Sequence, residues 1–237
     1  MSSDFNFTYS RETTIHAFRD YYRFLIHMFM NESKIIEPPE GGWPDISPAF
    51  KDYTGKSDSV IDLLRHLPYN DGKVESNGSP DDRWSDWQDL AKRHIGSLPF
   101  GEHRNELISR ESLLAKTEPL GEYRARDDPD DQVIPSHAVG MTCGGRETWR
   151  FVLDTKLGTI HSEGWNGGDH HQRDVNDPFY VPHVCGIDGD ETENELGWRE
   201  SYAAWPIPDF FRLLKMKYCM LEWIPTTPHQ SLPHPIR

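Results

Sequence analysis

Long apolar runs, paired cysteines and a basic charge balance are all missing from this sequence. No run of about 18 apolar residues occurs, which argues against a membrane-spanning helix. The three cysteines, Cys143, Cys185 and Cys219, are far apart and odd in number, so a disulfide framework is not expected. The opening sequence MSSDFNFTYSRE has no basic region followed by an apolar run, which argues against a secretory signal peptide. Together these absences predict a cytoplasmic protein with reduced thiols, with a nuclear location left open.

Acidic residues outnumber basic ones by 39 to 25, which gives a formal net charge of -14. A field of this sign repels nucleic acid and anionic membranes, so neither is an expected partner. The charge favours a partner protein with a basic surface, although surplus acid also serves simply to keep a protein soluble. Eight Trp, nine Tyr and eleven Phe exclude a wholly disordered chain. A mean hydropathy of -0.74 with 18 Pro and 18 Gly predicts long polar insertions around an aromatic core.

The most regular pattern in the chain predicts a hairpin. Trp149, Phe151 and Leu153 occupy alternate positions, as expected for a strand with one face turned to a core. The segment 154–158 supplies an Asp and a Gly for a turn, and a return strand begins at Thr159. Nothing in this hairpin places a nucleophile beside a base, so we interpret it as structural.

Apolar residues at helical spacing predict three main helices. The first runs from about 12 to 30, with Ser10 or Thr13 as its N-cap and Asn31 as its end. The second begins after Ser57 and ends before Pro68. A shorter helix is expected near 84–95, and the last begins near Pro208 and is closed by Pro225. The apolar face of the last helix is predicted to contain Phe210, Leu214, Tyr218 and Leu221.

The order of these elements predicts a single α+β domain over residues 1–237. A helical portion covers about 12–116, and a small antiparallel or mixed sheet with the closing helix covers 137–225. Mobile polar loops are expected near 71–82 and 118–136, and a frayed tail over 226–237.

Motifs for catalysis or cofactor binding are weak. The stretch Thr54-Gly55-Lys56-Ser57 resembles the end of a phosphate loop, but Phe50 stands where that loop needs glycine. No cofactor is therefore expected, and no catalytic residue is assigned. The spacing matches no zinc pattern, but the residues that could gather around a transition metal are His170, His171, His183 and Cys185.

Two acidic runs are the predicted partner-binding segments, because exposed charges steer association. Solvated loops with no partner would explain the same residues. The runs contain Asp127, Asp128, Asp130 and Asp131, and Asp188, Asp190, Glu191 and Glu193.

Three stretches carry a resemblance to a known group of proteins. The segment 59–69 resembles part of small, mostly uncharacterised fungal proteins. The strand WRFVLDTKLGTI and the later W-x-I-x-D-F-F pattern at Trp205 resemble the SUKH superfamily, over residues 134–225. That superfamily contains fungal cell-wall-synthesis regulators and bacterial immunity proteins. The resemblance implies a non-catalytic, intracellular protein-binding or regulatory module. The alternative is a small, metal-assisted enzyme whose site lies among the sheet and the segment 167–195.

Overall fold

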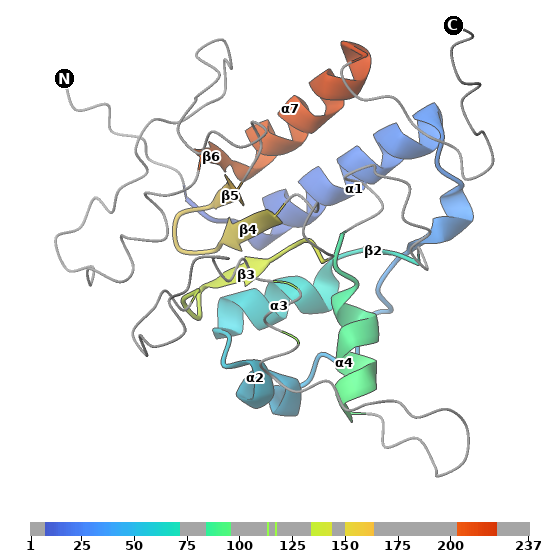
Figure 1. Ribbon diagram of the computed structural model, residues 1–237. Coiled ribbons are helices and arrows are strands. Elements are labelled where there is room, and N and C mark those ends of the chain that lie inside the picture. Colours follow the sequence, from blue (N-terminus) through green and yellow to red (C-terminus); the bar gives the residue numbers. More distant parts are fainter. Residues whose placement is uncertain are drawn as a thin grey trace, which may run out of the picture.

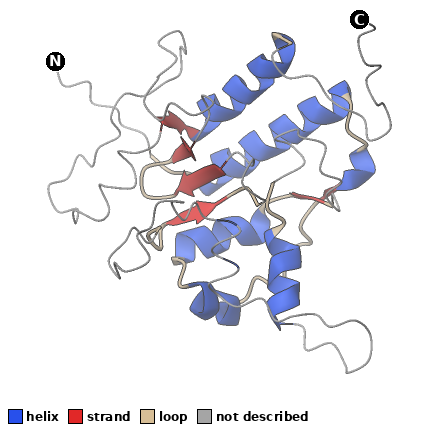
Figure 2. Ribbon diagram, viewed as in Figure 1, coloured by secondary structure: helices blue, strands red, loops and turns tan. Residues whose placement is uncertain are grey.

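The computed structural model describes residues 8–71, 84–95, 113, 117, 134–143, 150–163 and 203–221. Within these residues, helices lead the chain, a four-stranded antiparallel sheet follows, and a helix closes it (Figure 1). Figure 2 shows the sheet lying against two long helices, with the shorter helices grouped beside them. The predicted α+β class is therefore confirmed.

Helix α1 (Arg11–Met28) begins where its capping residue predicts. The Ser10 hydroxyl accepts a hydrogen bond from the backbone N–H of Thr13 at 3.3 Å, which satisfies one of the free donors of the first turn. The helix ends at Met28, two residues before the predicted end. Asn31 instead caps a short 3-10 turn, η1 (Glu32–Lys34), by accepting from the N–H of Ser33 at 2.9 Å.

Two helices occupy the segment around the apparent phosphate loop. Helix α2 (Pro48–Thr54), which the sequence pattern did not predict, is capped by Ser47 and ends at Gly55, whose φ is +70°. Helix α3 (Asp58–His66) is capped by Ser57 and confirms the predicted second helix. Gly55 and Ser57 are therefore a C-cap and an N-cap, which explains these residues without a nucleotide.

The sheet is a meander of β3 (Ala138–Gly140), β4 (Arg150–Asp154), β5 (Thr159–Glu163) and β6 (Ala203–Pro206). Strands β4 and β5 form the predicted hairpin. The Asp154 carboxylate accepts from the N–H of Lys156 at 2.7 Å, and Gly158 closes the turn with a φ of +70°. Strand β6 was not predicted as a strand. A second sheet pairs β1 (Ile35–Ile36) with β2 (Tyr69–Asn70).

The aromatic core lies between this sheet and the two long helices, α1 and α7 (Ile207–Cys219). Phe151 contacts Phe210 edge-on at a ring-centroid distance of 4.8 Å, and Trp84 at 5.7 Å. Phe211 in turn contacts Phe18 of α1 at 4.6 Å, so a chain of rings joins strand to helix. Phe151 and Leu153 are buried as predicted, whereas Trp149 lies outside the described residues.

The other face of β4 is also covered. Val152 is buried in a small cluster with Ile134 and Ala138. The period of two therefore marks which residues share a face, but it does not distinguish a half-exposed strand from one buried on both sides.

Helix α7 ends earlier than the sequence predicts. Its last residue is Cys219, and Leu221 takes a φ of +59°, which breaks the helical periodicity. Leu221 is 74% exposed, so the prediction that it shares the buried face of Phe210, Leu214 and Tyr218 is wrong.

Helix α4 (Trp87–Ile95) begins at a carboxylate that should make stability depend on pH. The Asp86 side chain accepts from the N–H of Asp89 at 2.9 Å, and burial raises the pKa of Asp86 above its ordinary 3.8. A raised pKa in the folded state means that stability falls as the pH rises through that pKa. We expect Asp86→Asn, which keeps an acceptor for the cap, to raise the free energy of unfolding at pH 7.

The gain from Asp86→Asn should disappear below about pH 3.8, where the aspartate is protonated in both the folded and unfolded states. Urea denaturation of both proteins at pH 7 and pH 3 measures this difference. A gain of equal size at the two pH values would show that ionisation of Asp86 is not its cause.

Candidate functional site

The residues that the sequence nominated for metal or partner binding lie outside the described part of the chain. This applies to the four metal candidates and to both acidic runs, so those assignments stay predictions. Within the described ranges, no group of three His, Cys, Asp or Glu side chains is placed to hold a metal ion. The structure instead brings together residues that sequence reasoning did not connect.

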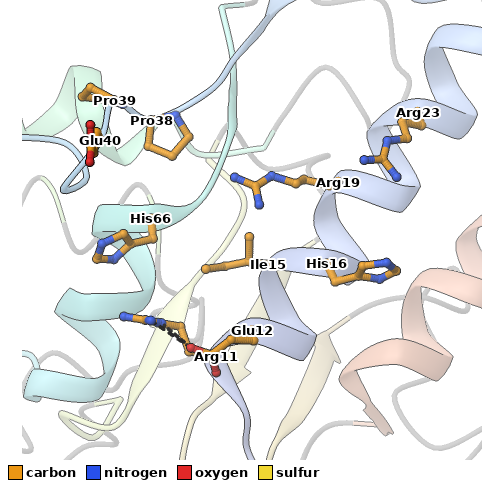
Figure 3. Close-up of a pocket in the computed structure, with 10 residues that line it drawn as sticks. All are labelled: Arg11, Glu12, Ile15, His16, Arg19, Arg23, Pro38, Pro39, Glu40 and His66. Atoms are coloured by element: carbon orange, nitrogen blue, oxygen red, sulfur yellow. Dashed lines mark hydrogen bonds and ion pairs between the residues drawn. The ribbon is translucent and has the colours of Figure 1, made fainter.

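An open groove of about 470 Å³ follows the exposed side of helix α1 (Figure 3). Its α1 wall is formed by Arg11, Glu12, Ile15, His16, Arg19 and Arg23. Ile15 is buried and supplies an apolar base, while the arginines extend from the helix. Figure 3 shows the Arg19 side chain reaching from α1 toward Pro38 and His66. The groove therefore presents cationic side chains over a small apolar base.

Four of these residues form one row along the helix. Arg11, Ile15, Arg19 and Arg23 follow one another at intervals of four, so they lie on the same strip of the helix surface. His27 continues the spacing. The four-residue spacing of these side chains is visible in the sequence, but the apolar face of the same helix is the stronger pattern. The spacing alone does not show which residues form the opposite wall of the groove.

The opposite wall consists of Pro38, Pro39 and Glu40, with His66 at the end of α3. The turn over 38–42 is closed by the Gly42 N–H, which donates to Pro39 O at 2.8 Å. It is attached to α3 by the Trp43 N–H, which donates to Arg65 O at 2.9 Å. Arg65 Nε donates back to Gly41 O at 3.0 Å.

The indole of Trp43 holds the far end of the turn. Its Nε1–H donates to Leu67 O at 2.8 Å, and the side chain is buried. Two prolines and these hydrogen bonds leave the wall little conformational freedom, so the groove exists before any ligand arrives.

Ion pairs neutralise two of the three arginines. Arg11 Nη1 lies 2.7 Å from Asp62 Oδ2, and Arg11 also pairs with Glu12. Arg19 donates two hydrogen bonds to Glu37 Oε2, from Nε at 3.0 Å and from Nη2 at 2.8 Å. This ion pair connects α1 to the residue before the proline turn. Within the described residues, the exposed Arg23 side chain makes no ion pair or hydrogen bond, and neither does His16.

The ionisation of the Arg11–Glu12 pair favours binding over acid–base chemistry. Its own backbone N–H and the Arg11 guanidinium lower the pKa of Glu12, and the carboxylates of Glu12 and Asp62 raise the pKa of Arg11. A general acid or base works best with a pKa near the working pH, and both groups are moved away from neutrality. The pair is therefore a fixed set of charges at pH 7.

A second surface feature lies where α1 and α7 end together. Met28, Phe29, Met220 and Leu221 are between 38% and 74% exposed. The ring of Phe29 lies 5.8 Å from that of Tyr218, so the end of α1 lies close to the last turn of α7. We call these four residues the apolar end cluster. Large apolar side chains gathered on a surface are a common feature of protein-binding sites.

Comparisons with known proteins give no relative for this chain: no family model, curated protein or solved structure matches it. No helix among the described residues is long and apolar enough to span a membrane.

Proposed function

We propose that this chain is a non-catalytic module of SUKH-like type that binds another protein. The observation that carries the proposal is the apolar end cluster, where two helices expose large side chains at one place. Burying such surface against a partner is the main source of affinity in protein association. The pre-formed groove beside α1 supports the same function, since its Arg11–Glu12 ion pair stays charged at pH 7.

The resemblance found in the sequence agrees with this proposal. The W-x-I-x-D-F-F stretch runs from Trp205 in β6 into Phe211 in α7, as a strand leading into a closing helix. The proposal includes a cytoplasmic location, in agreement with the few and widely spaced cysteines of the sequence.

A double substitution that introduces two negative charges tests the proposal. The chain is incubated with a native extract, and the proteins that bind to it are cross-linked to it. We expect the double variant Met28→Asp, Leu221→Asp to retain no partner, because a carboxylate would have to be buried unpaired in the interface. Quantitative mass spectrometry of the retained proteins is the measurement. The same melting temperature for variant and parent would show that folding is intact, as expected for exposed positions.

The matched control introduces the same change in charge on another surface. Lys92 is exposed on α4, and Lys92→Glu lowers the net charge by two, as the double variant does. This control should retain the same proteins as the parent. If the double variant also retains them, or if the control loses them equally, the apolar end cluster is not the binding surface.

A further inference from the structure

Leu221 holds a backbone conformation for which the fold does not require a leucine. Its φ of +59° lies in the left-handed region, where the Cβ of an L-residue crowds the following carbonyl oxygen. Among the described residues, every other positive φ belongs to a glycine, which has no Cβ: Gly41, Gly42, Gly55 and Gly158. The leucine is therefore an exception within its own chain.

The end of helix α2 shows a comparable position filled by glycine. Gly55 has a φ of +70°, and its N–H donates to Lys51 O at 2.8 Å. At the end of α7, the N–H of Leu221 donates to Tyr218 O at 3.0 Å, a bond that glycine would make equally well. Because the leucine side chain is 74% exposed, packing within the described part of the chain does not offset the strain.

Strained residues of this kind are concentrated at functional sites, where their conformation serves function at the expense of stability. An aliphatic side chain takes no part in acid–base or nucleophilic chemistry, so the role that remains for Leu221 is binding. Its neighbour Met220 is 62% exposed, and an unbranched thioether side chain adapts to an irregular surface.

The occupant of this surface is a different protein rather than a second copy. A stable interface takes about 20–30 residues from each partner, whereas only four large apolar side chains are exposed in the described part of the chain. Each copy also has a formal net charge of -14, so two copies repel each other. A partner with an apolar pocket needs one protruding side chain to fill it, while the surrounding contacts are polar.

We infer that Leu221 is the anchor of the partner-binding surface and inserts into an apolar pocket of the partner, sized for one branched aliphatic side chain. This inference rests on the proposed function and identifies, within the apolar end cluster, the residue that carries most of the affinity. Glycine at this position would relieve the strain and remove the anchor together. Stability and binding are therefore expected to change in opposite directions.

Thermal unfolding tests the strain. Leu221→Gly should raise the melting temperature by about 2–4 °C, because it removes a Cβ from a left-handed residue. Leu221→Ala keeps the Cβ and should leave the melting temperature within about 1 °C of the parent value. Gly41→Ala adds a Cβ in open space at a φ of +84°, so the loss that it causes calibrates the backbone cost. A Leu221→Gly variant no more stable than the parent would overturn the inference.

The probe of binding is the full chain with Met220→p-benzoylphenylalanine, a photo-crosslinking residue beside an intact Leu221. Irradiation in a native extract should link it to apolar residues of one protein, identified by mass spectrometry. Adding Leu221→Gly or Leu221→Ala should lower the yield of that product at least tenfold, with about tenfold expected for loss of an anchor. Leu221→Met, which keeps an apolar side chain of similar volume, should retain most of the yield.

The matched control is Lys92→p-benzoylphenylalanine on α4, which should not link the same protein. An equal yield from the Leu221→Gly and Leu221→Ala chains, a link to polar residues only, or no product from the probe would each overturn the inference. So would a dimer of the parent in sedimentation that Leu221→Ala dissociates, because the occupant would then be a second copy.

Failure of this inference and failure of the proposed function would look different. If the double variant Met28→Asp, Leu221→Asp loses its partner while Leu221→Gly and Leu221→Ala keep it, the apolar end cluster binds a protein but Leu221 is not its anchor. If the double variant also keeps every protein, the proposed function itself fails.

Discussion

Replacing Phe151 by alanine is expected to lower the free energy of unfolding by about 3–5 kcal/mol. The ring is 1% exposed and contacts Phe210 and Trp84, which themselves join the sheet to α7 and to the segment before α4. Its removal would leave a cavity at a point where several elements meet, and aromatic neighbours cannot collapse into it fully. Chemical denaturation with urea measures the loss.

The control for this prediction is another apolar truncation at an exposed site. Met220 is 62% exposed, so Met220→Ala should change stability by less than about 0.5 kcal/mol. If Phe151→Ala cost less than about 1 kcal/mol, the strand face that it marks would not be core, and the account of the fold would be wrong.

The second large effect is expected at Gly42. Its φ is +82°, and a Cβ added there would lie 2.7 Å from the backbone oxygen of Arg65 and 2.6 Å from its Cγ. The side-chain atom could move, but the carbonyl accepts the hydrogen bond from Trp43 N–H and belongs to helix α3. Gly42→Ala should therefore force the proline turn away from α3 and destabilise the protein by several kcal/mol.

Gly41 provides a control with nearly the same backbone conformation but with open space around an added Cβ. Its φ is +84°, almost the same, but an added Cβ would meet nothing within 4 Å. Gly41→Ala should cost only the backbone term, about 1–2 kcal/mol. The difference between the two variants isolates the steric contact that fixes the groove wall. Equal losses in thermal and urea denaturation would mean that the turn is not held tightly against α3.

Local signals in the sequence predict the elements that are fixed by local chemistry. The N-caps Ser10 and Ser57 and the turn at Asp154 follow from bonds within a few residues. Strand β6 was missed because Ala203–Pro206 has no alternation of its own and is defined by pairing with β5. Helix α2 was missed because its seven residues carry only Phe50 and Thr54 as buried positions.

The candidate groove could not be predicted for a related reason. It joins an exposed row on α1, a proline turn some twenty residues later and His66 on α3. A sequence pattern can show the row, but only tertiary packing shows that Arg19 reaches Glu37 across to the other wall. At Leu221 the sequence pattern was misleading. Its spacing matches the buried face of α7, but the helix ends at Cys219, before Leu221.

The most direct test of the proposed binding function is amide hydrogen exchange of the chain alone and with its retained partner bound. The account predicts slower exchange at the ends of α1 and α7, around 24–30 and 216–221, with α4 unchanged as an internal reference. Protection confined to α4 or to strand β3, or exchange that is the same in the free and bound chain, would contradict it.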